Sequence, residues 1–190
     1  ELLPYALVID MKFNNLDEMH DWCQENDIIA LDKSLIDKFQ QNHDVYEVCR
    51  APLFLKQSKK VNVVSYRTHN GQKEHYAIVI GDIDTVEPLV RIHSSCYTGD
   101  LLDSLSCDCR SQLQQAIHLI SDFGSGIILY LMQDGRGIGL INKLRAYSVQ
   151  QEYNFDTVDA NRIFGFDDDE RNFAIAAEML KKLNVKKIQF

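Results

Sequence analysis

The strongest restriction on the fold comes from an unbroken apolar run at residues 126–132, Gly-Ile-Ile-Leu-Tyr-Leu-Met. A continuous apolar run of this length is typical of a strand that is buried on both faces of a sheet. Helical periodicity precedes it at 111–123, with Gly124 as a stop signal, and returns after it at 139–153. The pattern therefore predicts a sheet strand between two helices.

Two β-rich runs earlier in the chain predict a hairpin. Residues 61–68 and 74–81 are joined by His-Asn-Gly-Gln, and Asn-Gly is a strong hairpin signal. Further patterns predict a strand at 89–94, a helix at 171–183 and a final strand at 185–190. The predicted fold class is α+β (mixed α/β), with a β-rich hairpin region followed by alternating helices and strands around a mixed sheet.

The first 50 residues follow a different pattern. Residues 16–26 and 33–41 have the periodicity of short amphipathic helices, and they flank a strand candidate at 28–31. We therefore expect a helix-rich N-terminal extension of unknown role at 1–50 and a main domain at 51–190. The chain begins with Glu rather than Met and ends within a strand pattern, so we expect it to continue at both ends.

The charge balance limits the partners of the protein. With 20 Lys and Arg against 28 Asp and Glu, the formal net charge is −8. This argues against nucleic acid or an anionic membrane as partner, because both require a basic surface. A few local Arg and Lys can still form a pocket for a small anion. No apolar run approaches the about 20 residues that span a bilayer. We expect a cytoplasmic protein, because the cysteine pattern favours a reducing compartment.

Three of the five cysteines, Cys96, Cys107 and Cys109, are clustered. An odd number of cysteines in this arrangement is a poor disulfide framework and favours metal binding or thiol chemistry. Thiolates suit zinc, and three protein ligands leave one tetrahedral position open, as in catalytic zinc sites. Two alternatives remain here: a closed structural site that recruits His93 or a distant residue, and a redox Cys-x-Cys pair without metal.

A glycine-rich loop, Gln-Asp-Gly-Arg-Gly-Ile-Gly, follows the predicted buried strand at 133–139. This is the position of a phosphate- or base-binding loop, because backbone N–H groups at a helix start favour anions. A simple tight turn is the alternative. In the loop, Asp134 suits a guanine edge and Arg136 a phosphate. The charged run at 167–171 fits the capping of a helix start, and its Arg171 can face a phosphate.

These separate motifs together resemble GTP cyclohydrolase II, over residues 91 to about 185. The motifs that carry the resemblance are His93-Ser94-x-Cys96-x-Thr98-Gly99-Asp100, Ser104-Leu105-x-Cys107-Asp108-Cys109-x-x-Gln112-Leu113, Gln133-x-Gly135-Arg136-Gly137-Ile138-Gly139-Leu140-x-Asn142-Lys143-x-Arg145-Ala146-Tyr147, Asp156-Thr157-Val158-Asp159-Ala160-Asn161 and Gly165-Phe166-x-x-Asp169-x-Arg171.

The resemblance implies a zinc-dependent hydrolase of riboflavin synthesis. Members of the family open the imidazole ring of GTP and release formate and pyrophosphate. The product is 2,5-diamino-6-ribosylamino-4(3H)-pyrimidinone 5′-phosphate, formed in the first step of the pathway. They use Zn²⁺ for ring opening and Mg²⁺ with the triphosphate, and they are typically homodimers. Carried over, Cys96, Cys107 and Cys109 hold one Zn²⁺ per subunit. A catalytically weak nucleotide-binding relative and a zinc-stabilised structural module are the alternatives.

The resemblance also implies roles for individual residues. Tyr147 is implied as a proton donor or orienting residue near the metal, Asp169 as a proton acceptor, and Arg171 as a nucleophile on the α-phosphorus. A guanidinium stays protonated and has no free lone pair, so we expect Arg171 to act as an electrostatic clamp instead. The implied GTP contacts are Arg91, Ile92, His93, Ser94, Ser95, Gln112, Asp134, Gly135, Arg136 and Thr157.

Overall fold

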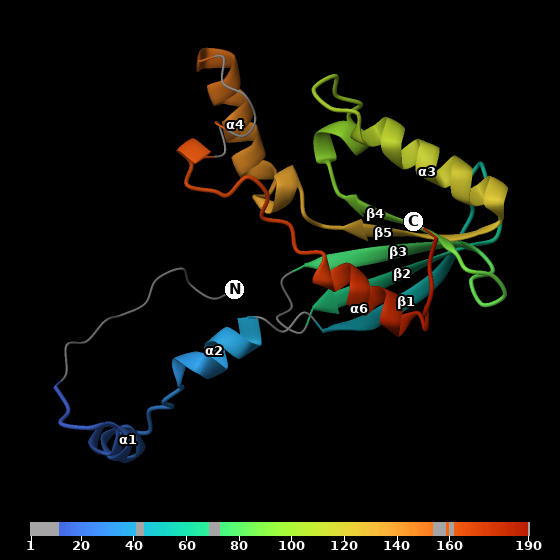
Figure 1. Ribbon diagram of the computed structural model, residues 1–190. Helices are drawn as coiled ribbons and strands as arrows, with labels where there is room; N and C mark the ends of the chain where they lie inside the picture. The colour runs from blue at the N-terminus through green and yellow to red at the C-terminus, as the bar shows by residue number, and fades with distance from the viewer. Residues whose placement is uncertain (1–11, 41–43, 69–72, 154–158, 160–161, 190) are drawn as a thin grey trace. The chain divides into compact units, whose positions relative to one another are not determined.

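The structure is a computed structural model that describes residues 12–40, 44–68, 73–153, 159 and 162–189. The chain forms two compact units, Glu1–Gln41 and Asn42–Phe190. Figure 1 shows their helices and strands.

The described part of the first unit contains the short helices α1 (Leu16–Glu25) and α2 (Lys33–Gln40), which confirm the two predicted ones. The Asn15 side chain caps α1 by accepting a hydrogen bond from the Glu18 amide at 2.8 Å. The predicted strand at 28–31 is wrong, because this segment forms no strand. Ile29 is exposed, and an apolar segment without a neighbouring strand has no ladder to join.

The second unit is built on a five-stranded mixed sheet, which confirms the predicted fold class. β4 and β5 are parallel, and the other neighbouring pairs are antiparallel. The strand order is β1-β2-β3-β5-β4, and the strands are β1 (Val45–Leu53), β2 (Val61–Thr68), β3 (Glu74–Gly81), β4 (Leu89–Ser94) and β5 (Ser125–Leu131).

The predicted hairpin is confirmed by the antiparallel pairing of β2 with β3. Its turn at 69–72 lies outside the described residues. β1 is not among the predicted strands. Its register shifts between Glu47 and Cys49, it contains Pro52, and of its residues only Val45 is buried. An edge strand with a bulge and a proline lacks the alternation by which strands are recognised.

The described part of this unit includes the helices α3 (Cys109–Phe123), α4 (Leu140–Tyr153) and α6 (Ala174–Lys182). α3 ends at Gly124, whose φ of 87° is left-handed, as the stop signal predicted. α6 begins at Ala174 rather than at 171. The predicted strand at 185–190 is wrong, because only an isolated bridge joins Gln189 to Leu89 in the part that is described.

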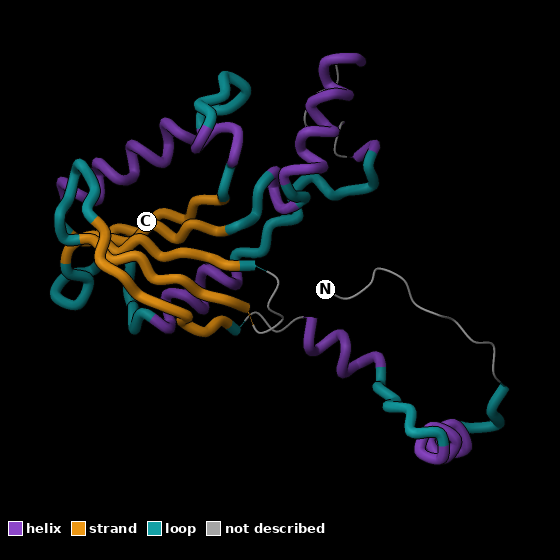
Figure 2. Tube along the Cα trace, turned by 180° about the vertical axis from the view of Figure 1, so that it is seen from behind, coloured by secondary structure: helices purple, strands orange, loops and turns teal. Residues whose placement is uncertain are grey.

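The sheet is buried by α3 on one face and by α6 on the other (Figure 1, and from behind in Figure 2). β5 supplies both cores: Ile128 packs with Ile117 and Ile120 of α3, while Leu129 shares the other core with Met179 of α6. This two-sided burial explains the unbroken apolar run of β5. None of the helices in the described ranges has both the length and the apolar character needed to cross a membrane.

We predict that Leu129→Ala, in the fully buried centre of β5, destabilises the protein by about 2–5 kcal/mol. The matched control is Leu119→Ala on α3, where the leucine side chain is mostly exposed and its loss should change little. Chemical denaturation of the two variants measures the difference. Equal midpoints would show that β5 is not the packing centre of the sheet.

Candidate metal centre

Parallel pairing of β4 with β5 places two loops side by side. Both strands end at the same edge of the sheet, where Ser94 is in register with Leu131. The pairing continues for one residue, since the Ser95 amide donates to the Leu131 carbonyl at 2.7 Å. The carboxyl ends of parallel strands are the usual location of ligand sites in such sheets. The loop after β4 carries the cysteines, and the loop after β5 is the glycine-rich one.

The three predicted thiols converge just beyond this edge. Cys96 precedes one π-helical turn, Tyr97–Leu101, and Cys109 is the first residue of α3. The sulfur atoms of Cys96 and Cys107 are 3.6 Å apart, and the three ligand atoms, with that of Cys109, all lie within 4.8 Å of one another. A tetrahedral site with metal–sulfur bonds of about 2.3 Å has sulfur–sulfur edges of about 3.8 Å. The three cysteines, which form no disulfide, can therefore hold a metal ion.

Gly99 leaves the space in which the thiols meet. A Cβ at this position would lie 2.7 Å from the Cys107 sulfur and 3.1 Å from the Cys96 sulfur. The Gly99 amide also donates to the Cys96 sulfur at 3.3 Å. The glycine is thus needed for close approach, which the cysteine spacing alone does not reveal.

Asp100 ties the cysteine loop to the sheet. Its carboxylate accepts from the Cys96 amide at 3.0 Å and from the Tyr130 hydroxyl at 2.7 Å, and it lies 3.2 Å from His93 Nε2. Burial lowers the pKa of His93, although Asp100 opposes the shift. His93 is therefore held by a carboxylate. Among the described residues, no His, Asp or Glu joins the three thiols, so the geometry does not support the closed site with His93.

Lys143 of α4 is a site residue that the sequence pattern does not single out. Its Nζ donates to the Cys96 sulfur at 2.9 Å and to Asp134 Oδ1 at 3.0 Å. Burial raises the pKa of the Cys96 thiol, but hydrogen bonds from Lys143, Thr98 and the Gly99 amide outweigh it and lower the pKa overall. The spacing of residues on α4 could have indicated this role, because Lys143 lies three and four residues before the cleft residues Ala146 and Tyr147 and so shares their helix face.

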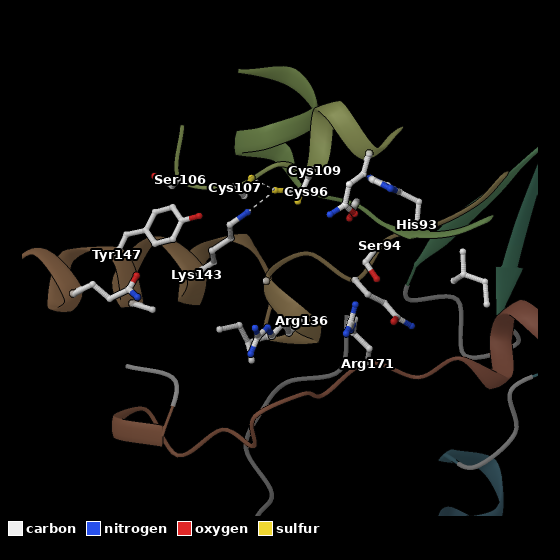
Figure 3. A pocket seen from close by; sticks show the side chains of 18 of the residues that line it. His93, Ser94, Cys96, Ser106, Cys107, Cys109, Arg136, Lys143, Tyr147 and Arg171 are labelled. Atoms are coloured by element: carbon white, nitrogen blue, oxygen red, sulfur yellow. Dashed lines mark hydrogen bonds between the residues drawn. The ribbon is translucent and has the colours of Figure 1, made fainter. Parts of the chain in front are cut away.

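The thiols line one end of a cleft of about 450 Å³ (Figure 3). Most of the predicted site residues line it as well: Arg91, Ile92, His93, Ser94, Ser95, Cys96, Cys107, Cys109, Gln112, Gly135, Arg136, Tyr147 and Arg171. The structure adds Ser106, Gln133, Ile138, Lys143, Ala146 and Gln150 to the lining. Asp134 and Asp169 are close by but do not line the cleft, and Thr157 lies outside the described residues.

The cleft is cationic although the chain is acidic. Arg91, Arg136, Lys143 and Arg171 line it, and no described Asp or Glu does. In Figure 3 the cysteines lie at one end of the cleft and the guanidinium groups of Arg136 and Arg171 at the other. A cleft lined by one sign of charge concentrates ligands of the opposite sign.

The glycine-rich loop after β5 lies against the segment that precedes α6, and this contact places Arg136 and Arg171 in the lining of the same cleft. Gly137 packs against Glu170 so tightly that a Cβ on the glycine would lie 2.6 Å from the Glu170 carbonyl carbon. The Glu170 amide also donates to the Arg136 carbonyl at 2.9 Å, while Arg136 itself has a left-handed φ of 58°. An Arg in this conformation is unusual, and such backbone positions are concentrated at functional sites.

The Asp169 carboxylate pairs with the guanidinium of Arg171 at 2.6 Å. These hydrogen bonds raise the pKa of Arg171 and lower that of Asp169. The guanidinium therefore stays charged. Asp169 also accepts from the Arg171 amide at 3.0 Å, a local bond that competes with helix formation and fits the late start of α6.

Three buried polar atoms of β4 have no hydrogen-bond partner among the described residues: Arg91 Nε, His93 Nδ1 and Ser94 Oγ. All three residues line the cleft. Buried polar groups are nearly always paired in folded proteins. Unpaired polar groups in a cleft lining therefore indicate a ligand that supplies their missing hydrogen bonds.

The fold and the site define a class: an α+β protein in which three thiols that can hold a metal ion stand at one end of a cationic cleft. The sequence profile of GTP cyclohydrolase II matches residues 47–190. The chain therefore belongs to the GTP cyclohydrolase II family.

Among the curated relatives, GTP cyclohydrolase-2 of Azospirillum brasilense is 43% identical over 185 residues, which cover 96% of this chain and 48% of that protein. GTP cyclohydrolase-2 of Haemophilus influenzae (strain PittGG) is 50% identical over 129 residues, 67% of this chain and 59% of the relative. The riboflavin biosynthesis protein RibBA of Synechocystis is 40% identical over 192 residues, 100% of this chain and 32% of the relative. The chain thus spans between about a third and three fifths of these relatives.

We predict that Gly99→Ala prevents metal binding, because the added methyl group occupies the space between the cysteine sulfurs. Metal content after loading with Zn²⁺ and desalting measures the loss, and circular dichroism checks the fold.

The control is Gly165→Ala. Gly165 has a left-handed φ of 79° but open space around its Cα. That variant should lose about 1 kcal/mol of stability and keep its metal. A Gly99→Ala variant with full metal content would contradict the assigned geometry.

Proposed function

We propose that this protein hydrolyses GTP, opening the imidazole ring of guanine with release of formate and pyrophosphate. The observation that carries the proposal is one cleft with a cluster of three thiols at one end and two guanidinium groups at the other. A nucleoside triphosphate has the matching polarity, with a base at one end and anionic phosphates at the other. Membership of the GTP cyclohydrolase II family supports GTP as the substrate.

The thiols of Cys96, Cys107 and Cys109 would hold Zn²⁺, one ion per subunit. Their spacing and the lack of a side chain at Gly99 fit a zinc ion held by three thiolates. When bound, Zn²⁺ supplies Lewis acidity and activates water for attack on C8 of guanine. Asp100 holds the cysteine loop in place through the Cys96 amide.

The residues of the cleft would bind GTP along its length. The unpaired atoms of Arg91, His93 and Ser94 supply hydrogen-bonding groups on β4, and Tyr147 on α4 can donate or orient a proton beside the thiols. Arg136 and Arg171 would face the triphosphate, which would carry Mg²⁺. The proposed GTP contacts also include Ile92, Ser95, Gln112, Gly135 and Thr157.

Arg171 would stabilise the negative charge that develops as pyrophosphate leaves. Its ion pair with Asp169 keeps it protonated, so it cannot supply a lone pair to the α-phosphorus. Asp169 holds the guanidinium in position and can accept a proton from water. Asp134 is already bonded to Lys143 and to the Tyr97 amide, so any contact with GTP adds to those bonds.

The product of this reaction is 2,5-diamino-6-ribosylamino-4(3H)-pyrimidinone 5′-phosphate, in the first step of riboflavin biosynthesis. Relatives named riboflavin biosynthesis protein RibBA support this placement. We further propose a cytoplasmic homodimer. The acidic charge balance argues against nucleic-acid or membrane partners.

The direct test is to incubate the protein with GTP, Zn²⁺ and Mg²⁺ and to measure formate and pyrophosphate. We predict that both are released, that a chelator stops formate release, and that added Zn²⁺ restores it. Cys107→Ser should give a folded, metal-poor and inactive protein. Unfolding of that variant would support a structural module instead, and binding of GTP without formate would indicate a catalytically weak relative.

We predict that Arg171→Lys retains part of the pyrophosphate release, whereas Arg171→Met loses about 100-fold or more, because a cation is what the leaving group requires. Steady-state rates with GTP provide the measurement. Arg162→Met is the matched control, since Arg162 also pairs with an aspartate, Asp168 at 2.9 Å, but does not line the cleft. Isolation of a peptide that carries GMP on Arg171 would contradict the electrostatic role.

A further inference from the structure

Lys143 is a buried cation with a small set of partners. Only 8% of the residue is exposed. A buried ammonium group is costly unless it is paired and hydrogen-bonded. Its Nζ has two such partners, the Cys96 sulfur at 2.9 Å and Asp134 Oδ1 at 3.0 Å. Cys96 is a proposed metal ligand, so the lysine is hydrogen-bonded directly to one of the three thiols (Figure 3).

The surroundings hold the lysine side chain in one position. Gly135 packs against its stem, since a Cβ on the glycine would lie 3.0 Å from Lys143 Cβ. The ring of Tyr147, one turn later on α4, has its centroid 5.9 Å from the ammonium nitrogen. Asp134 is fixed as well, because its second oxygen accepts from the Tyr97 amide at 2.8 Å. The loop after β5 is thereby joined to the loop that carries Cys96.

We propose that Lys143 is a positioning residue of the metal centre, which donates a charged hydrogen bond to the Cys96 thiolate and anchors that bond on Asp134. This inference rests on the proposed function only to the extent that the three thiols bind a metal ion.

The charge of the centre gives the lysine its role. Three thiolates around a divalent cation leave one net negative charge, and thiolate donation weakens the cation as a Lewis acid. A hydrogen bond from an ammonium withdraws electron density from the sulfur and compensates the excess charge. Partners that hydrogen-bond to metal ligands are known to tune both the orientation of the ligands and the properties of the metal. Lys143 meets this description for Cys96 alone, according to the described contacts.

The test replaces Zn²⁺ by Co²⁺, whose thiolate-to-metal absorption band reports on the sulfur electrons. We expect Lys143→Met to bind Co²⁺ with this band shifted to lower energy, because the sulfur loses its hydrogen bond. Lys143→Arg, which keeps charged N–H donors, should show a smaller shift than Lys143→Met. The control is Arg145→Met, which removes an exposed cation of the same helix that bonds only Asn142 in the described contacts, and its band should equal that of the wild type.

The kinetic readout separates positioning from substrate binding. For Lys143→Met we expect kcat for formate release to fall at least about tenfold while KM for GTP changes little. An unshifted Co²⁺ band would overturn the proposal, and so would a raised KM with unchanged kcat, which would make Lys143 a substrate contact. The band is measured without GTP, so it stands even if the protein releases no formate.

Lys143→Gln covers the case in which the methionine variant does not fold. It keeps a neutral N–H donor but removes the charge, so we expect a smaller shift of the band in the same direction. If circular dichroism shows that neither variant folds, the role of the lysine is structural and the proposal is wrong.

Discussion

The parallel pairing of β4 with β5 is the constraint on which the rest of the site depends. Parallel neighbours require a long crossover, and here the crossover contains both the cysteine loop and α3. The same pairing brings the ends of the two strands together, so that the loop after β5 meets the loop after β4. Cys96 and Asp134, which are far apart in the sequence, are linked there through Lys143. The burial of β5 on both faces fixes this edge of the sheet.

Electrostatics then divides the cleft into two ends. Thiols, which become anionic when they bind a metal, gather at one end, and the guanidinium groups of Arg136 and Arg171 lie at the other. Three carboxylates near the cleft bind protein groups instead of lining it. Asp100 accepts a hydrogen bond from the cysteine loop, and Asp134 and Asp169 form ion pairs with Lys143 and Arg171. An acidic protein can in this way present a cationic cleft, since its carboxylates stay outside the lining.

Elements follow from the sequence where local pattern and tertiary burial agree. The β2–β3 hairpin carries its own turn signal, and β5 is apolar because both of its faces are covered. Strand predictions are wrong or missing where pairing with a neighbouring strand, not local sequence, decides whether a segment forms a strand. β1 has a bulge and is exposed at every residue except Val45, so its sequence shows no alternation. The apolar residues at 28–31 and at 185–189 find no full ladder to join.

The candidate site shows the same division. The spacing of the cysteines and the glycine-rich loop predicts the metal ligands and the location of the anion site, because these depend on residue type and local order. The roles of Gly99 and Lys143 do not follow from local order. One depends on the approach of sulfurs from different parts of a loop, and the other on how α4 is placed over Cys96. Asp134 was predicted to contact the base, and the structure gives its carboxylate two protein partners.

The central claim is that metal and nucleotide share one cleft in a defined orientation. A crystal structure with Zn²⁺ and a non-hydrolysable GTP analogue, with zinc located by its anomalous scattering, tests it most directly. We predict one zinc peak among Cys96, Cys107 and Cys109, the guanine against that end, and the phosphates on Arg136 and Arg171. A zinc peak elsewhere, or phosphates at the thiol end, would contradict it.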